Sequence, residues 1–414
     1  MDTLRVRAYN VLFGDAILIS IPDRGPDGVV ETRHILIDVG NVPKKVRGAS
    51  TDKTLVKMYK PVLEDVLKVL DGKPLDLYIL THEHADHAQG MFFAERKIFG
   101  DSENDLCQRL KTRYVWLTAS AAEDYKDRCP EAEKRHRIFA NTYAEIDHFL
   151  QALAASPEQI LGPVEAMWMN NNLWMNNPRN TDDCVGYVRA LNSDPKCVSY
   201  VHREFATEGH HPFHEATIEI WAPEEDSSIY YGKFRSMALA AMPGQGQESV
   251  LTVPTNRPPP GVDASAFYNL INMRRGYVEN LLAIDKAGNN TSIVFCLEWR
   301  GWRLLFPGDA EERSWKEMEK QGVLKKTVHF LKVSHHGSRN GTPNVDLLDV
   351  IIPPQPDDDK SRCALVSTYE GVYNGVPDDV PTLELIKERC DEFYDTRKVK
   401  PGDYVDIEFP AASA

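Results

Sequence analysis

The chain has 414 residues, and 48 Lys and Arg against 62 Asp and Glu give it a formal charge of −14. Hydrophobic residues make up 42% and charged residues 27% of the sequence, which is typical of a globular protein and excludes a disordered or fibrous one. The acidic balance argues against tight, charge-driven binding to long duplex nucleic acid, because that mode needs many basic side chains at phosphates. It does not exclude a nuclease, since metal ions can hold a phosphate locally.

The amino-terminal residues lack the basic stretch, apolar run and small-residue cleavage site of a signal peptide. No window approaches the roughly 18 consecutive apolar residues of a spanning helix. We therefore expect a cytoplasmic protein without membrane contact. The seven cysteines are dispersed and never form a Cys-x-x-Cys pair, which predicts reduced thiols rather than a disulfide framework or a cysteine zinc site.

The first half of the chain opens with predicted strands. An apolar stretch at 4–21, a Pro/Gly/Asp turn at 22–28 and an apolar run at 34–38 predict a strand, a turn and a strand. Apolar residues at helical spacing predict a helix over 54–70. The short apolar run 75–80 predicts a buried strand that delivers the next residues to the edge of a sheet.

The middle of the chain is less regular, and regularity returns in the last third. The middle contains a helical piece near 119–153, an Asn/Met/Trp stretch at 167–180 and a Pro/Gly/Gln/Ser-rich tract at 243–261, which we interpret as a mobile loop. The last third predicts strands at 292–299, 302–306 and 328–333, with a charged helix at 310–321 between the second and third.

The sharpest feature is the segment Thr81-His82-Glu83-His84-Ala85-Asp86-His87, directly after a predicted buried strand. Histidines and a carboxylate at this density are typical of a metal site, although a histidine-rich polar turn is the simpler alternative. His82 and His84 alternate along the loop and so reach one ion, while Asp86 and His87 reach a second ion beside it. Two adjacent ions are a common device for clamping the attacking and leaving oxygens in hydrolysis.

Two later segments have the same placement, each at the end of a predicted strand. Before Asp309, Gly308 allows a sharp turn, and the two oxygens of Asp309 can bridge two cations. Further on, the adjacent pair His335 and His336 leaves an apolar strand. Each segment alone is also compatible with an ordinary turn. Because sites in open sheets gather at strand ends, we expect the three segments to converge.

These segments make the chain resemble a metallo-β-lactamase-fold hydrolase, and within that superfamily it is most similar to the metallohydrolase domain of the ComEC/Rec2 competence proteins. The resemblance implies an α/β fold, the αββα sandwich, over a single domain 1–414 with insertions at 95–215 and 225–280. The matching segments are 14–19, 35–40, 81–87 with Gly90, 290–294, 304–309, 335–338 and 395–402.

The resemblance also implies a set of metal ligands. They are His82, His84, Asp86, His87, Asp309 and His335. His82 and His84 would hold one ion with His335 as third ligand, Asp86 and His87 would hold the other, and Asp309 would bridge. Either Asp86 or Asp309 would orient, or take a proton from, a metal-activated water.

Three further residues are expected around the ligands. Asp38 would orient the metal loop, and His336 and Ser338 would shape the substrate pocket. The choice of His335 over His336 as the ligand rests only on its place after the strand.

One position departs from the family pattern. Where the family usually carries a further metal histidine, the stretch 373–377 has Val376, which cannot bind a metal. The second ion would then be bound weakly, or be completed by water, by substrate or by one of His210, His211 and His214. These three histidines also fit a polar surface loop.

The leading function is a metal-dependent hydrolase, a phosphodiesterase or nuclease that uses a metal-activated water. The expected cofactor is one or two Zn²⁺ ions, with Mn²⁺ as an alternative, and the expected partner is a phosphodiester substrate such as a nucleic acid or a nucleotide. Two other functions stay open: a non-catalytic or regulatory metal-binding module, and a hydrolase of carboxylic esters, thioesters or lactones.

Weaker features fit the leading function without requiring it. The aromatic segment 168–175 is a candidate lid or base-stacking surface, although apolar packing of an insertion is the simpler explanation. The basic pairs Arg274-Arg275 and Lys325-Lys326 are candidate phosphate contacts or solvated surface.

Overall fold

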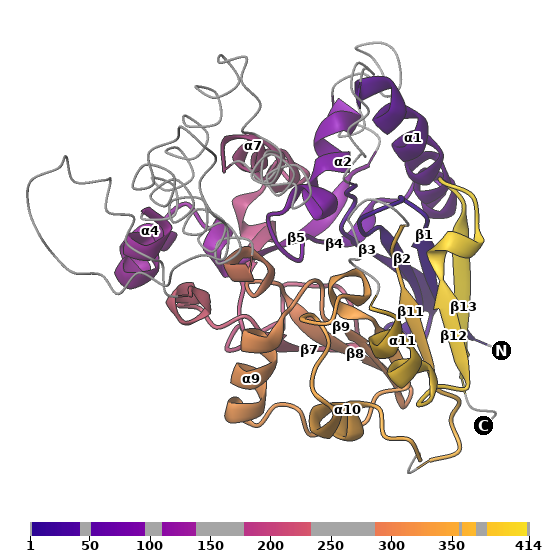
Figure 1. The fold of residues 1–414 in the computed structure, drawn as a ribbon. Helices are drawn as coiled ribbons and strands as arrows, with labels where there is room; N and C mark the ends of the chain where they lie inside the picture. The colour runs from indigo at the N-terminus through magenta and orange to yellow at the C-terminus, as the bar shows by residue number, and fades with distance from the viewer. Residues whose placement is uncertain are drawn as a thin grey trace, which may run out of the picture.

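The computed structural model describes residues 2–41, 51–95, 110–137, 178–232, 286–355, 358–369 and 379–411. Their strands form two mixed sheets (Figure 1). The seven-stranded sheet has the order β13 (Tyr404–Pro410), β1 (Thr3–Tyr9), β2 (Ile17–Arg24), β3 (Val30–Ile37), β4 (Leu75–Ile79), β5 (Thr112–Thr118) and β6 (Val198–Val201). The six-stranded sheet has the order β12 (Glu392–Asp395), β11 (Cys363–Val366), β10 (Phe330–Lys332), β9 (Trp302–Phe306), β8 (Val294–Trp299) and β7 (Thr217–Ala222).

Helices cover the outer faces of the two sheets (Figure 1). The seven-stranded sheet packs against α1 (Thr51–Leu70), α2 (Ala85–Glu95) and α7 (Pro178–Arg189). The six-stranded sheet packs against α9 (Glu312–Gln321), α10 (Val345–Ile351) and α11 (Val380–Lys387). A short helix, α4 (Tyr125–Arg128), follows β5. The described part of the chain is therefore α/β, with two sheets between two helical layers.

Alternation along the strands sends side chains to both faces. In β2, Leu18 packs under the helices, whereas Ile17 and Ile19 pack between the sheets. In β9, Leu305 faces the helices, while its neighbours face the other sheet. Both faces of each sheet are thus buried, which explains why the strands are read from the sequence as apolar runs.

Two indoles fix the sheets relative to each other. Trp299 Nε1 donates to the carbonyl oxygen of Pro22 at 2.8 Å, and Trp302 Nε1 donates to that of Pro410 at 2.8 Å. Both bonds join the six-stranded sheet to the seven-stranded one. Residues held at the same edge of the two sheets can therefore keep a defined geometry.

Each sheet combines an antiparallel part with a parallel part. The neighbours β3, β4, β5 and β6 are parallel, and so are β9, β10, β11 and β12. Because parallel strands end at the same edge, the segments that follow β3 and β4 lie together, as do those that follow β9, β10 and β11.

Most elements predicted in the described residues are confirmed, namely the helices at 54–70 and 310–321 and the strands at 75–80, 292–299, 302–306 and 328–333. The single strand expected at 4–21 is wrong, because residues 10–16 turn the chain between β1 and β2. The range 95–215, which was expected to be an insertion, supplies β5 and β6 to the seven-stranded sheet. In the part of 119–153 that is described, helical turns start after β5; the tract 243–261 and residues 167–177 lie outside the described residues.

None of the helices among the described residues combines the length and the apolar character needed to cross a membrane.

Candidate metal centre

The three predicted site segments meet where parallel strands end. The segment 82–87 follows β4 and runs into α2, whose first turn contains Asp86 and His87. Asp309 follows β9, and His336 lies in a short turn after β10. The expected convergence of segments distant in sequence is therefore found.

Glycines let the backbones of these segments approach closely. Gly14 has φ +146°, and a Cβ atom there would overlap the backbone oxygens of Gly40 and Asp86. A Cβ atom on Gly40 would overlap the backbone of Asp86 and His87. Gly308 has φ +55°, and a Cβ atom there would lie 3.0 Å from the Cβ atoms of Ser292 and Thr81. The loop that carries the histidines is thus clamped by backbone contacts that only glycine permits.

Four buried side chains form one compact group: Asp86, His87, Asp309 and His336, with ligand atoms all within 4.8 Å of one another. Asp309 Oδ2 lies 3.2 Å from His87 Nε2 and 3.2 Å from His336 Nε2. Asp86 Oδ2 lies 3.5 Å from His336 Nε2. We call these four residues the four-ligand group. Two imidazoles and two carboxylates that converge in this way could hold a metal ion.

The unpaired atoms of the group fit a cation. The Nε2 atoms of His87 and His336 and the Oδ1 atom of Asp309 are buried and have no hydrogen-bond partner. Buried polar atoms are normally paired, and an unpaired set of imidazole and carboxylate atoms this close together could bind a cation. The ligand types and the unpaired atoms are therefore both compatible with a bound metal ion.

Neighbouring groups determine which ring nitrogen faces the centre. Asp38 Oδ2 lies 2.8 Å from His87 Nδ1, and Asp38 also accepts from the Thr81 backbone N–H at 2.8 Å and the Thr81 hydroxyl at 2.7 Å. His336 Nδ1 lies 2.9 Å from the carbonyl oxygen of Ser367. Because these acceptors hold Nδ1–H, Nε2 of each ring is left for the centre.

Asp309 interacts electrostatically with both imidazoles of the four-ligand group. Burial disfavours its charged form, yet His336 and His87 outweigh that effect and hold the pKa of Asp309 well below its usual value. Burial likewise opposes protonation of the imidazoles, but Asp309 outweighs it, raising the pKa of His336 to about 9 and that of His87 well above its ordinary value. The carboxylate that attracts a proton to these rings equally attracts a metal cation.

His82 and His84 lie beside the four-ligand group. The His82 ring centroid is 4.2 Å from that of His87 and 4.6 Å from that of His84. His82 Nε2 is buried and unpaired, and burial lowers the pKa of His82 well below its usual value, which keeps the ring neutral. Among the described residues, neither histidine belongs to a set of three or more converging ligands.

The structure places His336, not His335, in the four-ligand group. Two residues, Val333 and Ser334, separate β10 from His335, and both histidines have positive φ, 45° and 54°. This tight turn directs His336 inward, and His335 Nδ1 instead lies 3.3 Å from Glu311 Oε1. His335 was expected to be the ligand because it comes directly after the strand, whereas the converging group contains His336.

The other expected positions have separate partners. The buried hydroxyl of Ser338 accepts from the Gly341 N–H at 3.2 Å, so Ser338 stabilises the turn. His210 Nδ1 lies 2.9 Å from the Ser199 hydroxyl, and His214 N–H donates to Asp23. Neither histidine joins the four-ligand group. Val376, Arg274 and Arg275 and residues 168–175 lie outside the described residues, and Lys326 pairs with Glu219 at 3.0 Å.

Four residues of the surroundings were not singled out from the sequence: Asp15, Glu311, Lys332 and Ser367. Glu311 holds His335 and accepts from Asn289 Nδ2 at 2.8 Å. His336 Nδ1 lies near the carbonyl oxygen of Ser367 and the carboxylate of Asp15, and Asp15 in turn pairs with Lys332. The Gly14-Asp15 dipeptide was the one available signal, since a glycine before a buried carboxylate marks a close backbone approach.

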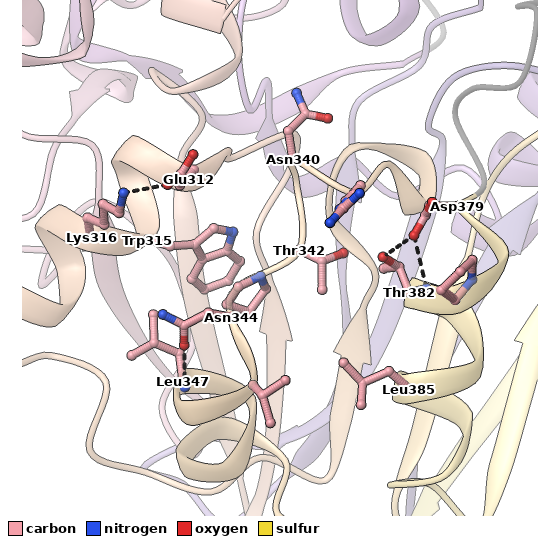
Figure 2. A pocket seen from close by; sticks show the side chains of 14 residues that line it. Glu312, Trp315, Lys316, Asn340, Thr342, Asn344, Leu347, Asp379, Thr382 and Leu385 are labelled. Carbon is pink, nitrogen blue, oxygen red and sulfur yellow. Dashed lines mark hydrogen bonds and ion pairs between the residues drawn. The ribbon is translucent and has the colours of Figure 1, made fainter.

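A pocket adjoins the loop that follows the histidine pair (Figure 2). Its volume is about 700 Å³, and it lies between α9, the loop 339–344 and the amino-terminal ends of α10 and α11. Arg339 and Lys316 contribute positive charge; Glu312 pairs with Lys316, and Asp379 caps α11 through Thr382. Arg339 is exposed and makes no ion pair with a described residue.

No protein-family model matches the chain, and no curated protein matches it significantly.

Proposed function

We propose that this protein is a metal-dependent hydrolase of the metallo-β-lactamase fold and that its substrate is a phosphodiester, such as a nucleic acid or a nucleotide. The observation that carries the proposal is the four-ligand group, which is buried, has ligand atoms within 4.8 Å of one another and includes unpaired Nε2 and Oδ1 atoms. Imidazole and carboxylate ligands suit Zn²⁺, and the carboxylate share also suits Mn²⁺.

A divalent ion bound there supplies a positive charge that lowers the pKa of a water molecule and stabilises the negative charge of the transition state. The protein's own groups do the rest. Asp38 and the Ser367 carbonyl hold the two imidazoles in one orientation. Asp86 and Asp309 are the carboxylates nearest to the centre, and either one accepts a proton from the attacking water.

His335 and Glu311 form a second functional pair beside the centre. Burial opposes protonation of His335, but Glu311 and Asp309 outweigh it and raise the pKa of His335 above its usual value. The His335 side chain is 19% exposed, whereas that of Glu311 is 3% exposed. A protonated imidazole at a solvent-accessible edge is suited to protonate the leaving oxygen of a phosphodiester.

Two features support a phosphodiester over a neutral ester. One is the resemblance of the metal segments to the ComEC/Rec2-type metallohydrolase domain. The other is the guanidinium of Arg339, which is exposed beside the pocket of Figure 2 and follows the histidine pair closely in the chain. Guanidinium groups bind phosphate oxygens through paired hydrogen bonds.

The test is hydrolysis of bis(p-nitrophenyl) phosphate before and after chelation, with a carboxylic ester, a thioester and a lactone assayed in parallel. Chelator-sensitive turnover of the phosphodiester supports the proposal. Turnover of one of the other substrates alone would replace it with that activity. Bound metal without turnover of any of them would indicate a binding module.

A further inference from the structure

A buried ion pair lies directly behind the metal centre. Lys332 and Asp15 are 1% and 2% exposed, and Lys332 Nζ lies 2.5 Å from Asp15 Oδ2. Lys332 ends β10 in the six-stranded sheet, whereas Asp15 lies between β1 and β2 of the seven-stranded sheet. The pair therefore joins the two sheets at the edge where the ligands meet. Burying two full charges is costly, and such a pair often stabilises a fold no better than apolar residues do.

Asp15 contacts the segments that carry both halves of the ligand set. The first half of the ligand set is Asp86 and His87, and the second half is Asp309 and His336. The backbone N–H of Asp15 donates to the carbonyl oxygen of Asp86, in the first half, at 3.2 Å. Its side chain accepts from the Ser367 hydroxyl, and the Ser367 carbonyl oxygen lies 2.9 Å from His336 Nδ1 in the second half. Asp15 Oδ1 itself lies 3.9 Å from His336 Nδ1.

Both carboxylate oxygens of Asp15 are thus in use. Oδ2 faces Lys332, and Oδ1 accepts from Ser367. Because Lys332 is only four residues before His336, the ion pair fixes the base of the histidine turn, and Ser367 fixes its ring. Asp86 and His87 come from one sheet, and Asp309 and His336 come from the other.

We propose that the Asp15–Lys332 ion pair is a positioning element that holds the two halves of the four-ligand group at metal-binding separation. This inference rests on the proposed metal centre. The proposed role goes beyond the mutual neutralisation of two buried charges. Neutralisation alone would be achieved equally well by replacing both residues with uncharged ones.

The double variant Asp15→Asn/Lys332→Met separates these roles. The single variants leave an unpaired buried charge and lower the unfolding temperature, whereas the double variant leaves none and recovers most of that loss. We expect the double variant nevertheless to bind Zn²⁺ about 10- to 100-fold more weakly than the wild type, as is usual when groups behind the ligands are lost. Affinity is measured by competition with a chromophoric chelator, and the absorption spectrum of bound Co²⁺ reports the ligand geometry.

Arg7→Met is the matched control. Arg7 lies 2.6 Å from Asp65 and 2.8 Å from Asp406, in a largely buried cluster that contains none of the four ligands. The Arg7→Met variant should have a lower unfolding temperature but unchanged Zn²⁺ affinity and an unchanged Co²⁺ spectrum.

Wild-type Zn²⁺ affinity in the double variant would overturn the positioning role while leaving the proposed function intact. A wild-type protein that takes up no metal would overturn both. If the double variant does not fold, Ser367→Ala provides the same test, because it keeps both charges and removes only the hydroxyl that Asp15 holds. Weaker Zn²⁺ binding by Ser367→Ala at an unchanged unfolding temperature supports the role, and unchanged binding overturns it.

Discussion

At the scale of single residues, the adjacent histidines 335 and 336 have different partners. His336 faces Asp309 and Asp86, while His335 faces Glu311. The sequence identifies the pair as chemically important, but the choice between them depends on the φ angles of a tight turn. Local pattern does not encode that turn, because the contact of Gly341 with the His335 side chain comes from further along the chain. The direction of each ring therefore becomes visible only in the fold.

Asp38 was expected to orient the metal loop, and it contacts both Thr81 and His87 of that loop. Its effect on metal affinity can therefore be measured. Asp38→Asn should weaken Zn²⁺ affinity about 10- to 100-fold, since the carboxylate no longer polarises His87. Asp76→Asn is the control, because Asp76 is also a buried carboxylate that accepts a backbone N–H, from His34 at 2.9 Å. Equal loss of affinity in both variants would show that general destabilisation, not orientation of His87, is responsible. Titration with a chromophoric chelator measures the difference.

A substitution at Arg339 tests whether this side chain binds the phosphodiester substrate. Arg339→Ala should raise KM for bis(p-nitrophenyl) phosphate about 10- to 100-fold with little change in kcat, because a lost charge-assisted contact to bound substrate is worth about 1.5 to 3 kcal/mol. Arg5→Ala removes the same charge from an exposed pair with Glu408 and should change neither constant. An unaltered KM in Arg339→Ala would remove this arginine from the substrate site.

At the scale of elements, strands and helices with strong periodicity could be predicted from the sequence, and the turn inside 4–21 could not. Residues 10–16 are apolar except for Asn10, Gly14 and Asp15, so the pattern looks continuous. The chain turns there because Gly14 adopts φ +146° against Gly40 and Asp86. Such a close approach between distant segments leaves only a glycine as its local signal.

Two glycine substitutions with opposite expected effects test this clamp. Gly40→Ala would place a Cβ atom on the backbone of Asp86 and His87, so it should lower both the unfolding temperature and metal affinity. Gly186→Ala, inside α7 with open space around its Cβ position, should stabilise the protein by about 0.5 to 1 kcal/mol through helix propensity. Thermal unfolding with and without Zn²⁺ measures both. Wild-type metal affinity in Gly40→Ala would contradict the clamp.

At the scale of the whole molecule, the site is a junction of two sheets. The sequence indicates most of its residues, because each follows an apolar strand, and the four-ligand group contains three of the six expected ligands, Asp86, His87 and Asp309, together with His336. Only His336 in that group had been assigned to the pocket instead. Which segments face each other depends on sheet order, and the Asp15–Lys332 contact between the sheets has no sequence signature.

A metal that joins the two sheets should stabilise the whole fold. Because only the folded state brings the four ligands together, free Zn²⁺ at about 100 times its Kd should add about 2.7 kcal/mol to the free energy of unfolding. Chelation should therefore lower the unfolding temperature, and Zn²⁺ should restore it. An unfolding temperature that is insensitive to chelator and to added Zn²⁺ would contradict a metal centre between the sheets.

The most direct test compares the metal content of the wild type with that of His336→Gln and His335→Gln, purified side by side and analysed by elemental mass spectrometry. The two variants make the same chemical change one residue apart. The four-ligand group predicts that the wild type and His335→Gln retain bound metal and that His336→Gln loses it. Metal retained by His336→Gln but lost by His335→Gln, or a wild type without metal, would contradict the account.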